Sequence, residues 1–247
     1  MVKCFQRHFF SELDSTQSLL RQWASQATLP EGTLIWTRHQ RAGYGRQGRS
    51  WWSSPGESLT FSFLLYPSPT SAAYLSAYIG VALHRTLQPY TAHPLYLKWP
   101  NDLWCIPQST LPAGKLAGIL IEVLWPQPSR PIALVGIGVN VYQRRFPPGL
   151  WACSLAQIGT PPRRLEALLD AFEAEFTHTY TLSESHLRTS FLAALWRKVW
   201  VEAGGQKQLA EISAWEGDKL RLKALSGEVW EIPAAQAAFE IALPCSL

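Results

Sequence analysis

The sequence predicts an α/β (α+β) protein with a large domain over residues 1–203 and a small β-domain over residues 204–247. Three observations lead to this prediction. Strand and helix patterns succeed one another through the larger part. Residues 116–125 and 132–142 are nearly continuous apolar runs, typical of strands covered on both faces. Beyond Gly204-Gly205, short strand patterns are joined by turns at 216–218 and 226–228, as expected of a small β-unit docked on the main domain.

The elements follow from periodicity and from chain-breaking residues. Asp14-Ser15-Thr16 are good N-cap residues and open a predicted helix that reaches Ala27. The long loop over 40–57 carries glycines and arginines, and loops of this length are usually functional. Further helices are predicted over 71–87, 165–181 and 186–200. Strands are predicted over 33–39, 59–66, 95–104 (bent at Pro100), 116–125 and 132–142.

Composition and charge limit the classes of protein and ligand that fit this sequence. Of 247 residues, 47% are apolar and 16% charged, which supports a sizeable core and argues against disorder. The net charge of +4 is spread along the chain, so phosphate-bearing ligands fit better than nucleic acid. The four cysteines (Cys4, Cys105, Cys153 and Cys245) lack metal-site or redox spacing and are read as free thiols. Without a leader pattern or an apolar run of about 18 residues, we expect a cytoplasmic protein with no membrane partner.

A lysine in an apolar strand is the first candidate for chemistry. Lys115 lies in Gly-Lys-Leu-Ala-Gly-Ile-Leu-Ile-Glu (114–122). Burying a lone charge is costly, so an anionic partner is expected, although the side chain could also extend to solvent at a strand edge. Arg46 and Arg49, in the glycine-rich segment 43–49, offer planar donors that match phosphate or carboxylate oxygens. Together these features indicate an enzyme that joins a carboxylate to a nucleotide.

Three neighbouring patterns support a ligand site. The two tryptophans at 51–52 would expose apolar area without reason unless they cover a ligand, whereas a plain surface loop is the alternative. Lys-Trp-Pro-Asn-Asp (98–102) turns an amide and a carboxylate outward, and an ordinary turn explains it about as well. Gly-Ile-Gly-Val-Asn-Val (136–141) places two glycines in a strand, which marks either a close ligand approach or tight packing.

In this order the patterns closely resemble those of the biotin–protein ligases. That family has Ser-Thr-Asn before its first helix, here Ser15-Thr16-Gln17, and Gln-x-x-Gly-Arg-Gly-Arg-x-Gly-Arg-x-Trp, here residues 40–51. The motifs at 98–102, 114–122 and 136–141 are intact. The resemblance covers residues 10–200 well and the last forty loosely. It implies a mixed β-sheet with packed helices and a small SH3-like β-unit at the C-terminus.

The resemblance implies an enzyme, biotin–[acetyl-CoA-carboxylase] ligase, that uses ATP to form biotinyl-5′-AMP and then attaches biotin to a lysine of a biotin carboxyl carrier protein. Biotin, ATP and Mg²⁺ are the expected small molecules. By this resemblance, Lys115 lies between the biotin carboxylate and the α-phosphate. Asp102 is a candidate either for magnesium or for ordering Arg49.

The implied site residues fall into three sets. The catalytic set is Lys115, Arg46 and Arg49. The biotin-binding set is Ser15, Thr16, Gln17, Gln40, Tyr44, Gly45, Arg46, Lys115 and Gly118. The nucleotide-binding set is Arg46, Arg49, Trp51, Asn101 and Asn140.

Two positions depart from the family pattern. Tyr44 replaces the first arginine of the loop, and Gln17 replaces asparagine. We expect Tyr44 to pack over the ligand while Arg46 keeps the charge, and Gln17, one methylene longer, to reach the edge of biotin still.

The remaining expectations concern partners and alternatives. Few residues precede the first motif, so we expect no winged-helix domain and no DNA partner. The resemblance allows a homodimer. A lipoate– or octanoate–protein ligase of the same broad fold is the alternative enzyme, and a non-catalytic module that binds a small ligand is the alternative class.

Overall fold

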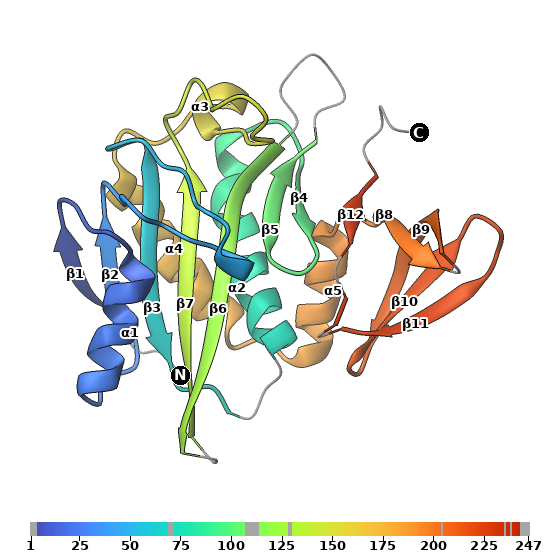
Figure 1. The fold of residues 1–247 in the computed structure, drawn as a ribbon, viewed down its shortest axis with the longest axis horizontal. Helices are drawn as coiled ribbons and strands as arrows, with labels where there is room; N and C mark the ends of the chain where they lie inside the picture. The colour runs from blue at the N-terminus through green and yellow to red at the C-terminus, as the bar shows by residue number, and fades with distance from the viewer. Residues whose placement is uncertain are drawn as a thin grey trace.

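The computed structural model describes residues 4–68, 72–106, 114–127, 130–203, 205–234, 236–237 and 239–242. Two sheets organise the chain (Figure 1). The larger has seven strands in the order β1-β2-β3-β7-β6-β5-β4, and the smaller has five in the order β11-β10-β9-β8-β12. The predicted fold class is confirmed, because a mixed sheet with packed helices is joined to a small antiparallel β-unit.

The seven-stranded sheet lies between α1 on one side and the other long helices on the opposite side. β1 runs parallel to β2, and every other neighbouring pair is antiparallel. All eight residues of β3 are buried, and most of β7 is buried too, so the centre of the sheet is covered on both faces. The strands are β1 (Gln6–Phe10), β2 (Thr33–Thr37), β3 (Ser58–Leu65), β4 (Leu95–Lys98), β5 (Asp102–Cys105), β6 (Gly114–Gln127) and β7 (Arg130–Asn140).

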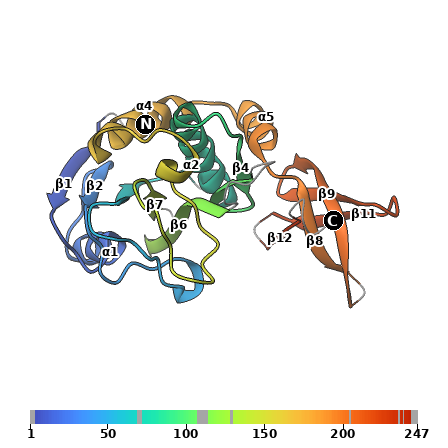
Figure 2. The ribbon, with the colours of Figure 1, turned by 90° about the horizontal axis from the view of Figure 1, so that it is seen from above.

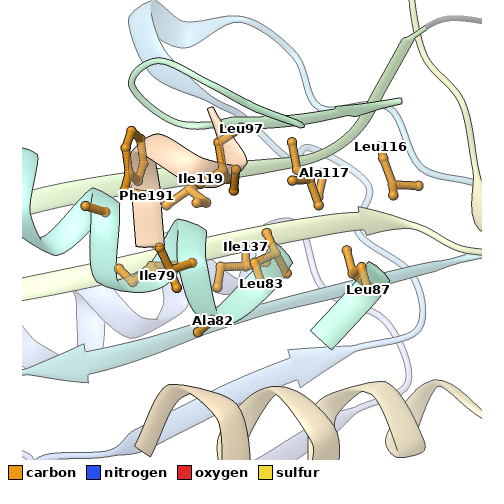
Figure 3. Packing of buried hydrophobic residues seen from close by; sticks show 14 of the residues in the cluster. Ile79, Ala82, Leu83, Leu87, Leu97, Leu116, Ala117, Ile119, Ile137 and Phe191 are labelled. Carbon is orange, nitrogen blue, oxygen red and sulfur yellow. The ribbon is translucent and has the colours of Figure 1, made fainter. Parts of the chain in front are cut away.

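Helices cover the sheet unequally. α1 (Thr16–Gln26) packs on β2, β3 and β7 from one side, whereas α2 (Ala72–Leu87) and α4 (Leu165–Thr179) lie on the other side (Figure 2). Leu20 of α1 joins a small core cluster with Ile35 and Leu134. The main core lies beneath α2, where Ile79 and Leu83 meet side chains of β4, β6 and β7 (Figure 3). Helix α1 covers only part of its side of the sheet, and the rest of that side is left for a ligand.

The remaining helices are short or peripheral. α5 (Glu184–Ala194) packs against α2 and brings Phe191 into the main core. α3 (Leu155–Ile158) is a single turn with a capping box between Ser154 and Gln157. Two 3₁₀ turns span Arg46–Gly48 and Gln88–Tyr90.

Two sequence predictions about elements are wrong. Residues 95–104 form a hairpin of β4 and β5 rather than one bent strand, because the chain reverses at Pro100 and the Asn101 N–H donates to the Lys98 carbonyl (3.1 Å). The helix predicted over 186–200 ends at Ala194, and Lys198 already begins a strand. Val199, Trp200 and Val201 follow one another in this strand, and β-branched and aromatic residues favour extended backbone.

The second sheet starts with that strand, β8 (Lys198–Ala203), and continues through β9 (Gln206–Glu216), β10 (Lys219–Ala224), β11 (Val229–Pro233) and β12 (Glu240–Ile241). The predicted turns are confirmed, with Gly217 at φ 57° and Gly227 at φ 91°, where a side chain would be strained. β8 precedes the division that we drew at residue 204, and Gly204 itself lies outside the described residues. Trp215 of β9 docks this sheet on Tyr74 and Trp99, at ring distances of 5.4 and 5.2 Å.

The described cysteines are free thiols, as the sequence analysis expected. Cys105 and Cys153 are buried free thiols and Cys4 is an exposed one, whereas Cys245 lies outside the described residues. Burial raises the pKa of Cys105 to about 11, which keeps that thiol protonated. Among the described residues, no helix is long and apolar enough to cross a membrane.

Candidate active site

A cleft lies on the α1 side of the sheet, beneath the loop 40–57, which crosses in front of β3, β7 and β6 (Figure 1). It has an inner part next to α1 and an outer part of about 370 Å³ that reaches the second sheet. Gly45, Arg46, Trp51, Asn101 and Lys115 line both parts, so the two form one continuous groove.

The structure brings the predicted site residues together in this groove, with one exception. The inner part contains Ser15, Thr16, Gln17, Gln40, Tyr44, Gly45, Arg46, Trp51, Asn101, Lys115 and Gly118. The outer part adds Arg49 and Asp102. Asn140 lines neither part. It is 3% exposed, and its Nδ2 donates to the Lys115 carbonyl (3.1 Å), so it lies beneath the lysine.

Hydroxyl and amide groups form the far wall of the inner part. Ser15 caps α1, and its Oγ accepts from the Ser18 N–H (3.3 Å). The Gln40 Oε1 accepts from the Thr16 backbone N–H (2.9 Å) and its hydroxyl (3.1 Å). The Thr16 hydroxyl also meets that of Ser62 (2.9 Å). This network holds the amide of Gln40 in one orientation at the cleft.

A second network contains both positions that depart from the family pattern. Gln17 Nε2 donates to Glu122 Oε2 (2.8 Å), and the Tyr44 hydroxyl lies 3.5 Å from the same oxygen. Arg21 of α1 pairs with the other oxygen of Glu122. The replacements at 17 and 44 therefore meet at one carboxylate.

The arginine loop is held by its own backbone. The Gly45 N–H donates to the Arg49 carbonyl (2.7 Å), and the Trp51 N–H donates to the Gly43 carbonyl (2.8 Å). Gln47 has a positive φ of 58°, which is uncommon for a residue with a side chain and marks the tip of a tight turn. The turn directs Arg46 and Arg49 into the outer part of the cleft.

Glycines of β6 and β7 make room for Trp51. A Cβ on Gly138 would lie 2.6 Å from Cζ2 of the indole, and a Cβ on Gly118 would lie 3.3 Å from Cζ3. The indole thus lies flat against the sheet, with its buried Nε1 unpaired. Trp52, which we expected to cover the ligand as well, packs on Phe146 instead (5.6 Å) and does not line the cleft.

Lys115 stands where the two parts of the cleft meet. Its Nζ pairs with Asp102 Oδ1 at 2.7 Å and lies 5.5 Å from the Trp51 ring centroid. The side chains of Lys115 and Asp102 are 29% and 14% exposed, so this ion pair is only partly shielded from water. The predicted need of Lys115 for an anion is met by Asp102.

The outer part is rich in positive charge. Arg46, Arg49, Lys98 and Lys115 line it, and Asp102 and Glu240 are the carboxylates among its lining residues. Burial lowers the pKa of the Lys98 amine below its ordinary value; Asp102 opposes this, and the neighbouring cations add to it. The excess of cationic side chains over carboxylates in the lining is what favours a bound anion. Arg46 also donates to the Asn101 side chain (3.4 Å).

Several lining residues were absent from the sequence prediction. Ser62 and Leu120 belong to predicted strands, but no role in the site was predicted for them. Lys98 is the first residue of the motif at 98–102, in which only Asn101 and Asp102 were predicted as site residues. Phe239 and Glu240 come from the C-terminal unit and reach the outer part of the cleft. No sequence signal marks those two, because their position depends on how the second sheet docks.

The residues present are a poor match for a built metal centre. Across the described residues no group of three His, Cys, Asp or Glu side chains could hold an ion. Two carboxylates, Asp102 and Glu240, line the cationic outer part, and Mg²⁺ commonly uses one or two carboxylates together with substrate phosphates. The cleft fits a magnesium ion carried by a nucleotide better than a resident one.

Comparison with known proteins identifies the family of this chain. Residues 9–141 match the model of the biotin/lipoate A/B protein ligase family, and the chain belongs to that family.

Relatives match over the same region. The chain is 34% identical over 135 residues to the bifunctional ligase/repressor BirA of Escherichia coli (54% of this chain, 40% of that protein). It is 35% identical over 131 residues to biotin--[acetyl-CoA-carboxylase] ligase of Mycobacterium tuberculosis (51% and 45%). The matches thus span less than half the length of these relatives.

Among solved structures, a biotin protein ligase from Aquifex aeolicus in complex with biotin and ATP superposes with a TM-score of 0.76. The match covers 96% of this chain and 99% of that one at 24% identity, which supports the fold.

Proposed function

We propose that the protein is a biotin–protein ligase, which activates biotin with ATP and transfers it to a lysine of a carrier protein. The observation that carries the proposal is the position of Lys115, between a polar inner pocket and a cationic outer pocket. An acid bound in the inner part and a nucleotide bound in the outer part would meet at its ammonium group.

The chemistry follows from that position. In the first step a carboxylate oxygen of biotin attacks the α-phosphorus of ATP, and pyrophosphate leaves. Two anions must approach each other for this bond to form, and a cation between them lowers the repulsion and stabilises the charge that develops. In the second step the amine of the carrier lysine attacks the acyl carbon, AMP leaves, and an amide is formed.

The other predicted residues take supporting roles in this proposal. Gln40, Thr16 and Ser15 offer hydrogen bonds to the ring system of the acid, and Trp51 offers a flat surface to the base or ring beside it. Arg46 and Arg49 bind phosphate oxygens and cover the adenylate. Asn140 acts through Lys115 by holding its backbone. Magnesium, brought by ATP, would use Asp102, which must then leave Lys115.

Acid-dependent exchange of labelled pyrophosphate into ATP tests the first step. We expect exchange with biotin and none with lipoate or octanoate. Exchange driven by lipoate or octanoate alone would assign the chain to the other branch of its family. Absence of exchange with all three acids, together with biotin binding seen by calorimetry, would indicate a module that binds without turnover.

Transfer tests the second step. A purified biotin carboxyl carrier domain should gain the mass of biotin at a single lysine in the presence of ATP and magnesium. The relative from Mycobacterium tuberculosis, whose name includes acetyl-CoA carboxylase, makes the carrier of that enzyme the first acceptor to try.

A homodimer also belongs to the proposal, since β1 and β4 are the edge strands of the large sheet; sedimentation velocity measures it.

A further inference from the structure

We propose that Glu122 is a positioning residue, which fixes the amide of Gln17 so that the cleft selects an acid whose ring carries an N–H donor. This inference rests on the proposed function and deepens it, because it identifies the group that separates a cyclic urea such as biotin from a dithiolane such as lipoate. Glu122 does not line the cleft and acts through Gln17.

The two hydrogens of the Gln17 amide are both used away from the ligand. Nε2 donates to Glu122 Oε2 at 2.8 Å and to the Leu134 carbonyl at 3.1 Å. Gln17 Oε1 is buried and has no hydrogen-bond partner. It lies on the side of Gly136, where an added Cβ would be 2.8 Å from it, and both Gln17 and Gly136 line the inner part of the cleft.

The opposite orientation of the amide is excluded by the same partners. If the amide were flipped, Oε1 would face a carboxylate oxygen and a carbonyl oxygen at hydrogen-bond distance, and three acceptors would face one another. Glu122, together with the Leu134 carbonyl, therefore orients Gln17 so that it presents an acceptor, not a donor, to the cleft.

Glu122 is itself held in place. Arg21 pairs with its Oε1, and the Tyr44 hydroxyl lies 3.5 Å from its Oε2. Its side chain is 20% exposed, so the protein shields most of it and limits its orientations. The carboxylate thus links α1, the arginine loop and β6 to a single amide.

An unpaired buried acceptor favours a ligand that supplies a donor. Gln17 is 3% exposed, so water reaches it poorly, and an acid without a donor at this point would leave Oε1 unsatisfied. A ureido ring carries two N–H groups. A dithiolane ring carries only sulfur atoms, which do not donate.

A double-mutant cycle tests the inference, with Gln17→Met, Glu122→Ala and the combined variant. Gln17→Met keeps the length of the side chain and removes the amide. We expect it to raise the KM for biotin about tenfold to a hundredfold. Glu122→Ala should raise it about tenfold because the amide becomes free to rotate. The KM for ATP should stay within about twofold in both. Since Glu122 acts through Gln17, the combined variant should be no worse than Gln17→Met alone.

Glu173→Ala is the matched control. Glu173 is also a partly buried carboxylate paired with an arginine (17% exposed, 2.7 Å from Arg7), but it lies on α4, across the sheet from the cleft. Its removal should alter the melting temperature about as much as Glu122→Ala and leave the KM for biotin unchanged.

Competition with other acids supplies a second readout. Both single variants should weaken desthiobiotin, which keeps the ureido ring, as much as biotin, and should leave weak competition by lipoate unchanged. Additive losses in the cycle, or an equal loss for lipoate, would overturn the positioning role. If the unaltered protein activates no biotin at all, the proposed function fails instead, so the two failures are distinguishable.

Discussion

At the scale of single residues, Lys115 is held in the cleft by the carboxylate of Asp102. The Nζ–Oδ1 distance of 2.7 Å is that of a close ion pair, and the lysine lines both parts of the cleft. Lys115→Ala removes the charge between the two reacting anions. We expect adenylate formation to fall by about a hundredfold or more, in line with the loss of one preorganised electrostatic contact. Single-turnover formation of the labelled adenylate measures it.

The fold should survive this change, because Lys115 and Asp102 are both reached by solvent and the lysine backbone stays bonded to β7 through Asn140. Lys219→Ala, which removes an exposed lysine paired with Glu231 on the second sheet, is the control and should leave the rate unchanged. A rate for Lys115→Ala within threefold of the unaltered protein would refute the assigned role.

Retention of the adenylate separates Tyr44 from Arg46. Tyr44 makes its polar contact with Glu122 at the 3.5 Å limit, whereas Arg46 brings a charge to both parts of the cleft. Tyr44→Phe should therefore change release of the labelled adenylate little, and Arg46→Gly should speed it at least about tenfold, since a phosphate contact is lost. Release into a trap of unlabelled biotin is the measurement, and equal effects of the two changes would contradict this division.

At the scale of elements, β7 carries two glycines whose missing side chains serve different ends of the cleft. A Cβ on Gly136 would meet Gln17, whereas a Cβ on Gly138, two residues along the same face, would meet Trp51. Gly136→Ala should mainly raise the KM for biotin, and Gly138→Ala, by lifting the indole off the sheet, should mainly raise the KM for ATP. We expect shifts of about fivefold to fiftyfold, the range of a few lost contacts.

Each glycine variant is the control for the other, because both add one methyl group to the same strand. Steady-state exchange at varied biotin and varied ATP gives the two constants, and circular dichroism checks that the sheet is intact. If both variants raised both constants equally, the strand as a whole would have shifted, and the separate roles of the two glycines would be refuted.

Elements with a regular pattern were predictable, and those set by long-range contacts were not. The Ser15 cap and the apolar spacing after it located α1 to within a residue, because both signals are local. The hairpin at Pro100 was predicted as a bent strand, because the apolar residues on both sides of the turn fit one strand as well as two paired ones. Trp200 was assigned to a helix, although pairing with β9 holds it in a strand.

The site shows the same division. Lys115 and the arginine loop were predictable because their residue types have a chemical reason, whereas Gln40 was predicted from the family resemblance alone. Trp51 and Trp52 are adjacent and identical, so their residue type could not show which of them enters the cleft, and only the family resemblance singled out Trp51. Glu122 was visible in its motif, but its contact with Gln17 spans 105 positions and depends on the packing of α1 on β6.

At the scale of the whole molecule, the second sheet contributes to the cleft and is held there by aromatic contacts. Trp215 is 4% exposed and lies between Tyr74 of α2, Trp99 of the β4–β5 turn and Phe191 of α5. Trp99 immediately precedes Pro100 and Asn101, which line the outer part of the cleft. The docking of the second sheet and the shape of the outer part of the cleft are thus coupled through the contact between Trp215 and Trp99.

Trp215→Ala should lower the free energy of unfolding by about 3–5 kcal/mol, as expected for truncating a buried aromatic side chain. Because Phe239 and Glu240 reach the cleft from the same unit, the KM for ATP should rise several-fold more than the KM for biotin, which binds at the far end. Urea unfolding and exchange kinetics below the unfolding midpoint measure the two effects. Trp230→Ala, which shortens an aromatic on the outer strand β11, is the control. Equal rises in both constants, or a rise for Trp230→Ala as large as for Trp215→Ala, would show that general loosening rather than the docked edge controls the nucleotide end.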